Sequence, residues 1–368
     1  MWPSISSPRH QSSARRSGPD DLADEATIRA SFTEQAGFCT QLGAPFTALL
    51  SETLGKRLDR STETGRRILN WGGDPGCFAD AVALRLCGGL HFLARSGAAP
   101  GLAALYPPAP MPDEASLWGA LAPVLADESL PAWLDHAPQT NEVGRSAVLM
   151  SGLLVIADRF KMPVRLYELG ASAGLNLLLD RYGYDLGGLL TGDPASGVQV
   201  KPAWEGPPPP KAAVTVAGRR GTDLNPARLP DDGGRLLAYV WPDQPERLQR
   251  LEAALAIAAD TPPEVDRAGA ADWIEAQLAL EPEPAVVRVV MHSVAFQYFD
   301  ADSQRRVAAN IEAAGERALA NAPLAWLRYE QEPESKRPSL RLRTWPGDET
   351  LLAWAHPHGR SVRWLSDH

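Results

Sequence analysis

The sequence predicts an α/β protein in which an all-helical domain precedes a domain built on a parallel sheet. Before residue 160, apolar residues recur at helical spacing and few segments alternate as strands do. After residue 160, strand patterns alternate with helix patterns, which is typical of a parallel sheet with helices on both faces. The last strand patterns follow one another without a helix, so we expect an antiparallel edge.

Length and composition restrict the class of protein. The 368 residues suit two domains, and a hydrophobic content of 44% allows a large core. The net charge of −9 argues against a nucleic-acid binder. The odd number of cysteines, at Cys39, Cys77 and Cys87, shows no metal-ligand spacing and favours a reducing compartment. We therefore expect a cytoplasmic protein that acts on a small molecule, without a metal site.

We expect neither a membrane span nor a secretory signal in this sequence. Its most apolar run, residues 147–157, is about half of the ~20 residues that a membrane-spanning helix needs. Residues 1–24 are rich in Ser, Pro and Arg and contain no apolar segment, so we expect a disordered tail there.

Residues 25–146 make up the expected helical domain. Helical spacing predicts helices over residues 26–42, 45–58, 78–94, 116–125 and 129–134. The polar segment QTNEVGRS, residues 139–146, precedes an apolar helix over 147–160. Two interpretations of this segment stay open. Asn141 caps the helix with Glu142 in its first turn, or Asn141 and Arg145 face a ligand.

The stretch PVRLYELGASAGLNLLLDRY, residues 163–182, organises the second domain, residues 147–368. It predicts a buried strand over 164–168, a turn of small residues, and a helix over 175–182. Backbone N–H groups at such a turn can hold an anionic or polar ligand. The pattern E-x-G-x-S-x-G suits a cofactor-binding turn, whereas G-x-S-x-G also suits the nucleophile elbow of a serine hydrolase.

The rest of the second domain supplies further strands and helices. Strands are predicted over residues 213–217, 264–267, 286–291, 324–329, 340–344, 350–355 and 361–365, and helices over 246–259, 270–280 and 303–320.

In the hydrolase interpretation, Ser172 is the nucleophile. His356 or His358 would be the base and Asp223 or Asp348 the acid, in the chain order of that fold. The helical segment before the motif and the lack of an upstream oxyanion motif argue against this interpretation. The pair of His356 and His358 is more simply a polar turn than a metal site.

In the cofactor interpretation, acids at strand ends hold the ligand. Glu168 can accept hydrogen bonds from a cationic or hydroxylated group, and Asp223 can bind ribose hydroxyls. Asp266 or Asp272 would reach a base edge. His292 ends the fourth strand, either as a structural group or as a general base.

Six segments together resemble a bacterial protein family without an assigned function: QTNEVGRS, ELGASAGLNLLLDRY, DLNP, YVWPDQ, HSVAFQYF and AHPHG. The second domain also resembles the Rossmann-like fold of class I S-adenosylmethionine-dependent methyltransferases. That resemblance implies a cofactor held by Glu168, Gly170, Ser172, Gly174, Asp223 and Asp272. Ser172 stands where these enzymes usually carry glycine, and the fourth strand lacks the N-P-P-Y sequence of enzymes that methylate amino groups of DNA bases.

The sequence thus predicts methyl transfer from S-adenosylmethionine to a small molecule. His292 would remove a proton, and substrate would be bound by Asn141, Arg145, Trp241, Gln297 and Tyr298. Asp243, close to Trp241, is also expected to cap the helix that follows it. The alternatives are a serine hydrolase using Ser172 and a non-catalytic module that senses a nucleotide or similar ligand. No nucleic-acid or membrane partner is expected, and the oligomeric state is left open.

Overall fold

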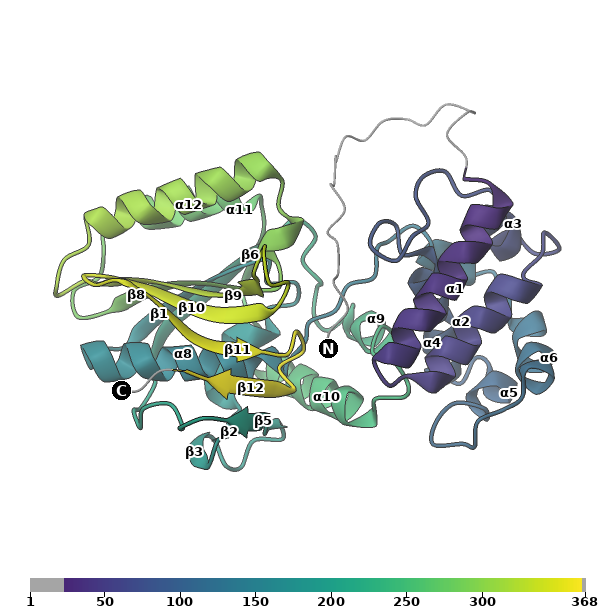
Figure 1. Ribbon diagram of the computed structural model, residues 1–368, viewed down its shortest axis with the longest axis horizontal. Helices are drawn as coiled ribbons and strands as arrows, with labels where there is room; N and C mark the ends of the chain where they lie inside the picture. The colour runs from purple at the N-terminus through teal and green to yellow at the C-terminus, as the bar shows by residue number, and fades with distance from the viewer. Residues whose placement is uncertain (1–22, 366–368) are drawn as a thin grey trace. The chain divides into compact units, whose positions relative to one another are not determined.

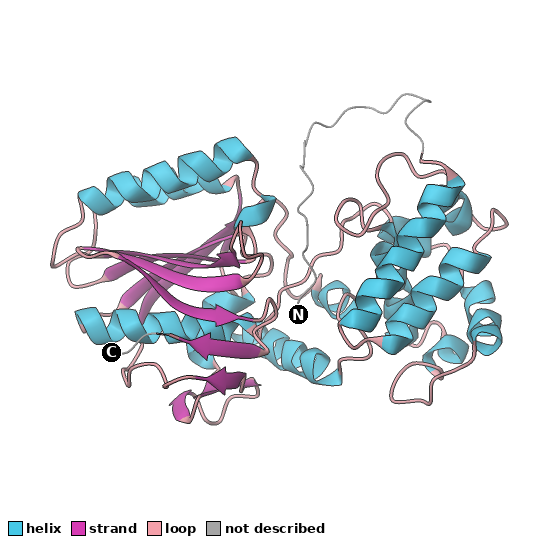
Figure 2. Cartoon of the chain, viewed as in Figure 1, coloured by secondary structure: helices cyan, strands magenta, loops and turns pink. Residues whose placement is uncertain are grey.

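The computed structural model describes residues 23–365, which fall into two compact units. Residues 141–231 and 250–365 carry the sheet, and residues 23–140 and 232–249 are helical (Figures 1 and 2). The predicted division assigned all of 147–368 to the sheet domain, whereas contacts within the chain group 232–249 with the helices. Of the predicted disordered tail, residues 1–22 lie outside the described residues, and Asp24 is the N-cap of the first helix. No helix within residues 23–365 has the length and apolarity to cross a membrane.

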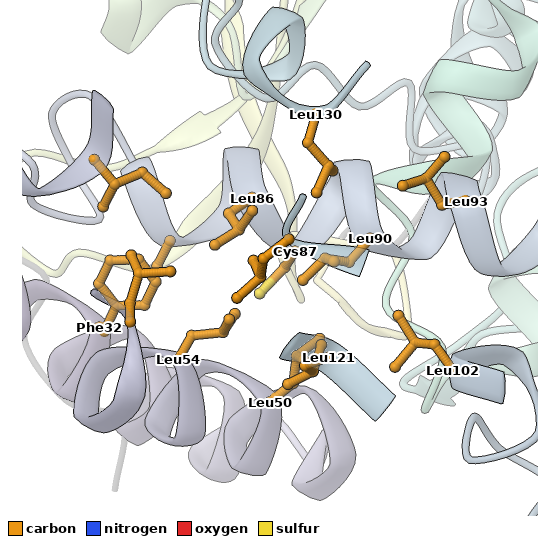
Figure 3. Packing of buried hydrophobic residues seen from close by; sticks show 14 of the residues in the cluster. Phe32, Leu50, Leu54, Leu86, Cys87, Leu90, Leu93, Leu102, Leu121 and Leu130 are labelled. Carbon is orange, nitrogen blue, oxygen red and sulfur yellow. The ribbon is translucent and has the colours of Figure 1, made fainter. Parts of the chain in front are cut away.

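The helical unit contains the predicted helices and two short additional ones before residue 140. Its elements are α1 (Glu25–Gln41), α2 (Pro45–Arg57), α3 (Glu63–Leu69), α4 (Val82–Arg95), α5 (Pro100–Ala103), α6 (Glu114–Val124), α7 (Leu130–Trp133) and α9 (Gly233–Ala238). Leucines of these helices form one core with those of α4, and Figure 3 shows Leu54 of α2 and Leu86 and Leu90 of α4 within it. A Cβ at Gly88 of α4 would lie 2.5 Å from Cε1 of Tyr239, so the segment after α9 packs directly on the α4 backbone.

Asp243 joins residues 232–249 to the start of α2. Its carboxylate accepts hydrogen bonds from Phe46 N at 2.7 Å, Thr47 N at 3.0 Å and Thr47 Oγ1 at 2.6 Å. The expectation that Asp243 caps the helix that follows it is therefore wrong. Its carboxylate instead caps α2, whose N-cap residue Ala44 has no side-chain acceptor.

We expect Asp243→Ala to lower the free energy of unfolding by about 1–2 kcal/mol, because α2 loses the side-chain cap that Asp243 supplies. Urea denaturation would measure this change. Asp231→Ala, in an exposed loop position, is the matched control. Equal stabilities of the two variants would contradict the capping role.

The sheet unit has helices on both faces of a nine-stranded sheet (Figure 1). Helix α8 (Arg145–Phe160) covers one face, and α11 (Ala270–Ala279) and α12 (Ala301–Glu316) cover the other. Helix α10 (Pro245–Asp260) has residues in both units. The strands are β1 (Val164–Leu169), β5 (Ala203–Glu205), β6 (Val216–Asp223), β7 (Val265–Arg267), β8 (Val287–Ser293), β9 (Leu324–Gln331), β10 (Pro338–Trp345), β11 (Glu349–Ala355) and β12 (Ser361–Trp364).

The expectation of a mostly parallel sheet that becomes antiparallel toward one edge is confirmed, although the outermost strand on that side, β5, pairs parallel with β12. Strands β7, β6, β1, β8 and β9 are parallel neighbours in that order, whereas β10, β11 and β12 continue antiparallel from β9. The strand order reverses between β1 and β8, because β6 follows β1 on one side and β8 lies on the other. In open sheets of this kind, ligands bind beyond the carboxyl ends of the strands at that reversal.

The connection that leaves β1 differs from the prediction. The expected α-helix over 175–182 is a 3₁₀ helix, η1 (Leu175–Arg181), and a small sheet follows it, made of β2 (Gly183–Leu186), β3 (Leu189–Gly192) and β4 (Gln199–Val200). Tyr182 Oη donates to Leu175 O at 2.7 Å and Tyr184 Oη to Leu179 O at 2.6 Å. These hydroxyls occupy carbonyls of η1, and its leucines are buried on all sides, so the amphipathic face that favours an α-helix is missing.

Candidate ligand-binding site at the carboxyl ends of β1 and β8

The turn after β1 is built on left-handed backbone. Gly170, Ser172 and Gly174 have φ angles of 70°, 55° and 75°, and Ser172 is the one for which this conformation is uncommon. A Cβ at Gly170 would lie 2.6 Å from Ala295 Cβ, and one at Gly174 2.8 Å from Val265 Cγ2. The space beside these glycines is thus filled by the protein itself, whereas we expected it to admit a ligand.

Asp223, at the end of β6, holds this turn. Its Oδ2 accepts from Ser172 N and its Oδ1 from Asn225 N, both at 2.9 Å. Thr222 lies in register with Leu169, so Asp223 lies beside the start of the turn. Each carboxylate oxygen has two lone pairs, and the half-buried side chain retains acceptor capacity for ribose hydroxyls.

Glu168 is a fully buried carboxyl group at the end of β1. Among residues 23–365, its Oε2 has no hydrogen-bond partner, and the same is true of Ser172 Oγ and Asn176 Oδ1, which lie just after it in the chain. Burial and the nearby charge of Asp223 raise the pKa of Glu168 from its ordinary value of 4.5 to about 8, against the lowering effects of Arg145 and of a hydrogen bond with Asn176. Buried polar atoms normally have partners, so these atoms mark a candidate site.

Residues of the QTNEVGRS segment reach the same region. Asn141 Oδ1 accepts from Leu175 N at 2.9 Å, at the start of η1. The expectation that Asn141 caps α8 is wrong, because the N-cap of α8 is Gly144 and has no side-chain hydrogen bond. Arg145, the first residue of α8, donates from Nε to Pro357 O at 2.9 Å and from Nη1 to Ser293 O at 3.0 Å. Arg145 thereby lies at the carboxyl end of β8.

His292 is fully buried, with both ring nitrogens in hydrogen bonds. Trp326 Nε1 donates to His292 Nε2 at 3.1 Å, and an indole nitrogen can only donate. The ring proton must therefore lie on Nδ1, which donates to Glu330 Oε1 at 2.7 Å. Phe296 stacks on the ring with centroids 4.8 Å apart. In this arrangement no lone pair of His292 is open to a substrate proton, contrary to what a general base requires.

The strand register also separates His292 from Glu168. Glu168 pairs with Met291, so the side chains of Glu168 and His292 point to opposite faces of the sheet. Tyr167, Leu169, Val290 and Trp326 pack with α11 and α12, which places His292 on that face and Glu168 on the α8 face.

Glu330, near the end of β9, is a structural residue behind the site that sequence reasoning missed. Its Oε1 accepts from His292 Nδ1 and also from Ala295 N at 3.0 Å and Phe296 N at 3.1 Å. The available signal was an acid near the end of a buried strand, the same signal that identified Glu168. Glu330 fixes both the imidazole and the loop after β8.

Within residues 23–365, the remaining predicted site residues form no hydrogen bond or ion pair with Glu168, Asp223 or Arg145. Gln297 and Tyr298 are exposed in η2 (Phe296–Tyr298), and Tyr298 is 67% exposed. Trp241 belongs to the helical unit, where it packs on Cys39 and its neighbours. Asp272 forms an exposed ion pair with Arg306 at 2.5 Å, and the structure does not bring it to Glu168. These residues stay predictions.

The turn between β11 and β12 lies next to Arg145, which donates a hydrogen bond to Pro357 O in that turn. Tyr329 Oη donates to His356 O, and His358 N donates to His356 Nδ1 at 3.1 Å. Within residues 23–365, no group of three or more His, Cys, Asp or Glu side chains could hold a metal ion.

Comparison with known protein families gives a match over most of the chain. The model of a family described as "Uncharacterized protein conserved in bacteria (DUF2332)" matches residues 29–364. No curated protein and no solved structure matches the chain.

Proposed function

The chain belongs to this bacterial family, and we propose that its sheet unit binds S-adenosylmethionine and transfers the methyl group to a small molecule. The observation that carries the proposal is the set of unpartnered acceptors around Glu168. A buried carboxylate oxygen without a donor costs several kcal/mol, and a ligand that supplies N–H groups offsets that cost. A primary ammonium has three N–H donors, which match Glu168 Oε2, Asn176 Oδ1 and Ser172 Oγ in number.

Two further features support the proposal. Asp223 ends the strand next to β1, where a carboxylate can bind the hydroxyls of a ribose. The parallel strands follow the order β7, β6, β1, β8, β9, which is the doubly wound order of nucleotide-binding sheets. A ligand that joins an ammonium group to a nucleoside fits both acids at once.

In this proposal catalysis rests on alignment. S-adenosylmethionine would supply an electrophilic methyl group on its sulfonium, open to in-line displacement. Glu168 and Asp223 would fix the two ends of the cofactor beside the end of β8. His292 would position the loop after β8 rather than move a proton, because its nitrogens are held by Trp326 and Glu330. An acceptor that is already nucleophilic suits this arrangement.

The same observation on His292 favours a second candidate, the non-catalytic sensing module. Such a module would keep the cofactor contacts and lack turnover. The serine hydrolase alternative has less support, since Ser172 Oγ has no hydrogen-bond partner among the described residues and a nucleophile needs a base within reach.

We expect Asp223→Ala to weaken binding of S-adenosylhomocysteine about 100-fold, through loss of hydrogen bonds to a charged acceptor. Calorimetry would measure the affinity, with Asp272→Ala as the control, because Asp272 is engaged with Arg306 at the surface. A wild-type protein that binds neither S-adenosylmethionine nor S-adenosylhomocysteine would rule out the proposal. Tight binding without methyl transfer to any acceptor in a broad screen would identify the sensing module.

A further inference from the structure

We propose that Arg145 and Glu168 together bind the zwitterionic end of an α-amino acid, Arg145 taking the carboxylate and Glu168 the ammonium group. The choice of S-adenosylmethionine as the molecule that carries this group rests on the proposed function. The receptor for the amino acid group itself rests on the charges and contacts of the two residues.

The fold brings the two side chains to neighbouring strand ends. Glu168 lies near the end of β1, in register with Met291 of β8. Arg145 Nη1 is bound to Ser293 O, two residues further along β8. Neighbouring strands lie about 4.8 Å apart, so the guanidinium and the carboxyl group belong to one small region at the sheet edge. Both are on the α8 side, since Arg145 begins α8 and Glu168 points to that face.

Each of the two groups lacks a partner of opposite charge. The printed bonds of Arg145 go to two neutral carbonyl groups, and no carboxylate within residues 23–365 lies within 4.0 Å of its guanidinium. Glu168 likewise has no cation within that distance in the described part of the chain. The charge of Arg145 nevertheless lowers the pKa of Glu168, so the two groups are within electrostatic reach. They stand close enough to interact and too far apart to pair.

A zwitterion fits this separation. The Nε and Nη1 atoms of Arg145 are occupied, so its orientation is fixed. Its Nη2 has no hydrogen bond to the described part of the chain and can donate to a carboxylate. On the other side, an ammonium group would donate to Glu168, Asn176 and Ser172. The ligand's carboxylate meets the charge of Arg145, and its ammonium group meets Glu168, which gives up its proton to solvent on binding. A ligand that lacks either group leaves one of these two protein groups without its partner. Such a site discriminates strongly against the incomplete ligand.

The first test uses analogues of S-adenosylhomocysteine with the wild-type protein. The decarboxylated analogue keeps the amine, the deaminated analogue keeps the carboxylate, and 5′-methylthioadenosine lacks both. We expect each to bind at least 10-fold more weakly than S-adenosylhomocysteine, and 5′-methylthioadenosine to bind most weakly. Equal affinities across the series would overturn the proposal.

The second test crosses the analogues with variants. Arg145→Ala should weaken binding of S-adenosylhomocysteine and of the deaminated analogue, and leave the decarboxylated analogue unchanged. Glu168→Gln should show the reverse selectivity. A variant that merely folds poorly would weaken all ligands alike, and such a uniform loss would contradict the assigned roles.

These outcomes separate the receptor from the proposed function. If 5′-methylthioadenosine and S-adenosylhomocysteine bound with equal affinity, the protein would have a nucleoside site, and the proposed binding of an amino acid group by Arg145 and Glu168 would be wrong. Thermal stabilisation by free methionine or other α-amino acids, lost in Arg145→Ala, without any stabilisation by S-adenosylhomocysteine, would keep the receptor and eliminate the cofactor.

Discussion

Replacing Glu168 by glutamine should make the ligand-free protein more stable above neutral pH while removing most of its affinity for S-adenosylhomocysteine. Burial and the charge of Asp223 raise the pKa of Glu168 to about 8 in the folded protein, whereas an unfolded chain has the ordinary value of 4.5. The folded state therefore holds this proton more tightly. Its stabilising contribution is complete below pH 4.5 and is lost as the pH rises through about 8.

The size of this effect follows from the shift. Stability falls by roughly 1.4 kcal/mol for each pH unit over which the proton is bound only in the folded state, so several kcal/mol are at stake across the interval. Glutamine has nearly the same shape and no charge to lose. The difference in unfolding free energy between Glu168→Gln and wild type should thus grow between pH 5 and pH 8.5.

Urea denaturation at several pH values would measure that difference. Titrating groups that do not interact with Glu168 contribute equally to both proteins and cancel, such as His91, whose pKa burial lowers to about 4. Glu281→Gln, at an exposed position before β8, controls for the loss of one carboxylate. If Glu168→Gln were no more stable than wild type at pH 8.5, Glu168 would not be a buried carboxylate that lacks a partner in the ligand-free protein.

The order of the main helices and strands was predictable because each of these segments shows its own periodicity, whereas short elements such as α3 and α5 were not predicted. The leucine pattern of α10, the apolar run of β8 and the helix-free segments after β9 each indicate one type of structure. The sequence is ambiguous for η1, where apolar residues are consecutive and tertiary hydroxyl contacts decide between a 3₁₀ and an α-helix. Grouping of residues 232–249 with the helices depends on contacts almost 200 residues apart in sequence, such as Asp243 with Thr47, which local patterns do not encode.

The site was predictable only where the backbone alone determines position. Strand-end acids such as Glu168 and Asp223 reach the same edge of any parallel sheet, so their proximity follows from order and spacing. The face to which a side chain points depends on the register between strands, and a shift of one residue reverses it. The register of β1 with β8 places His292 opposite Glu168. The hydrogen bond from Trp326, which fixes the His292 tautomer, comes from a strand later in the chain.

Replacing Glu330 by alanine should cost about 3 kcal/mol or more of unfolding free energy, because three donors lose one shared acceptor. Two of these donors are backbone N–H groups of the loop after β8, and the third is the buried Nδ1–H of His292. Glu330→Gln keeps a side-chain oxygen and should cost less. Denaturation of both variants would give these values.

Nitrogen NMR of the imidazole would show the mechanism directly. Wild type should show the proton of His292 on Nδ1. Glu330→Ala should keep that tautomer, because Trp326 still donates to Nε2, but the Nδ1–H signal should shift because the proton has lost its acceptor. Since Glu330 and Glu168 lie on opposite faces of the sheet, S-adenosylhomocysteine should bind the folded Glu330→Ala protein within about threefold of wild type. If Glu330→Ala instead lost ligand binding while keeping its stability, Glu330 would be a ligand contact. His292 and Glu330 would then belong to the binding site and would not merely support the fold.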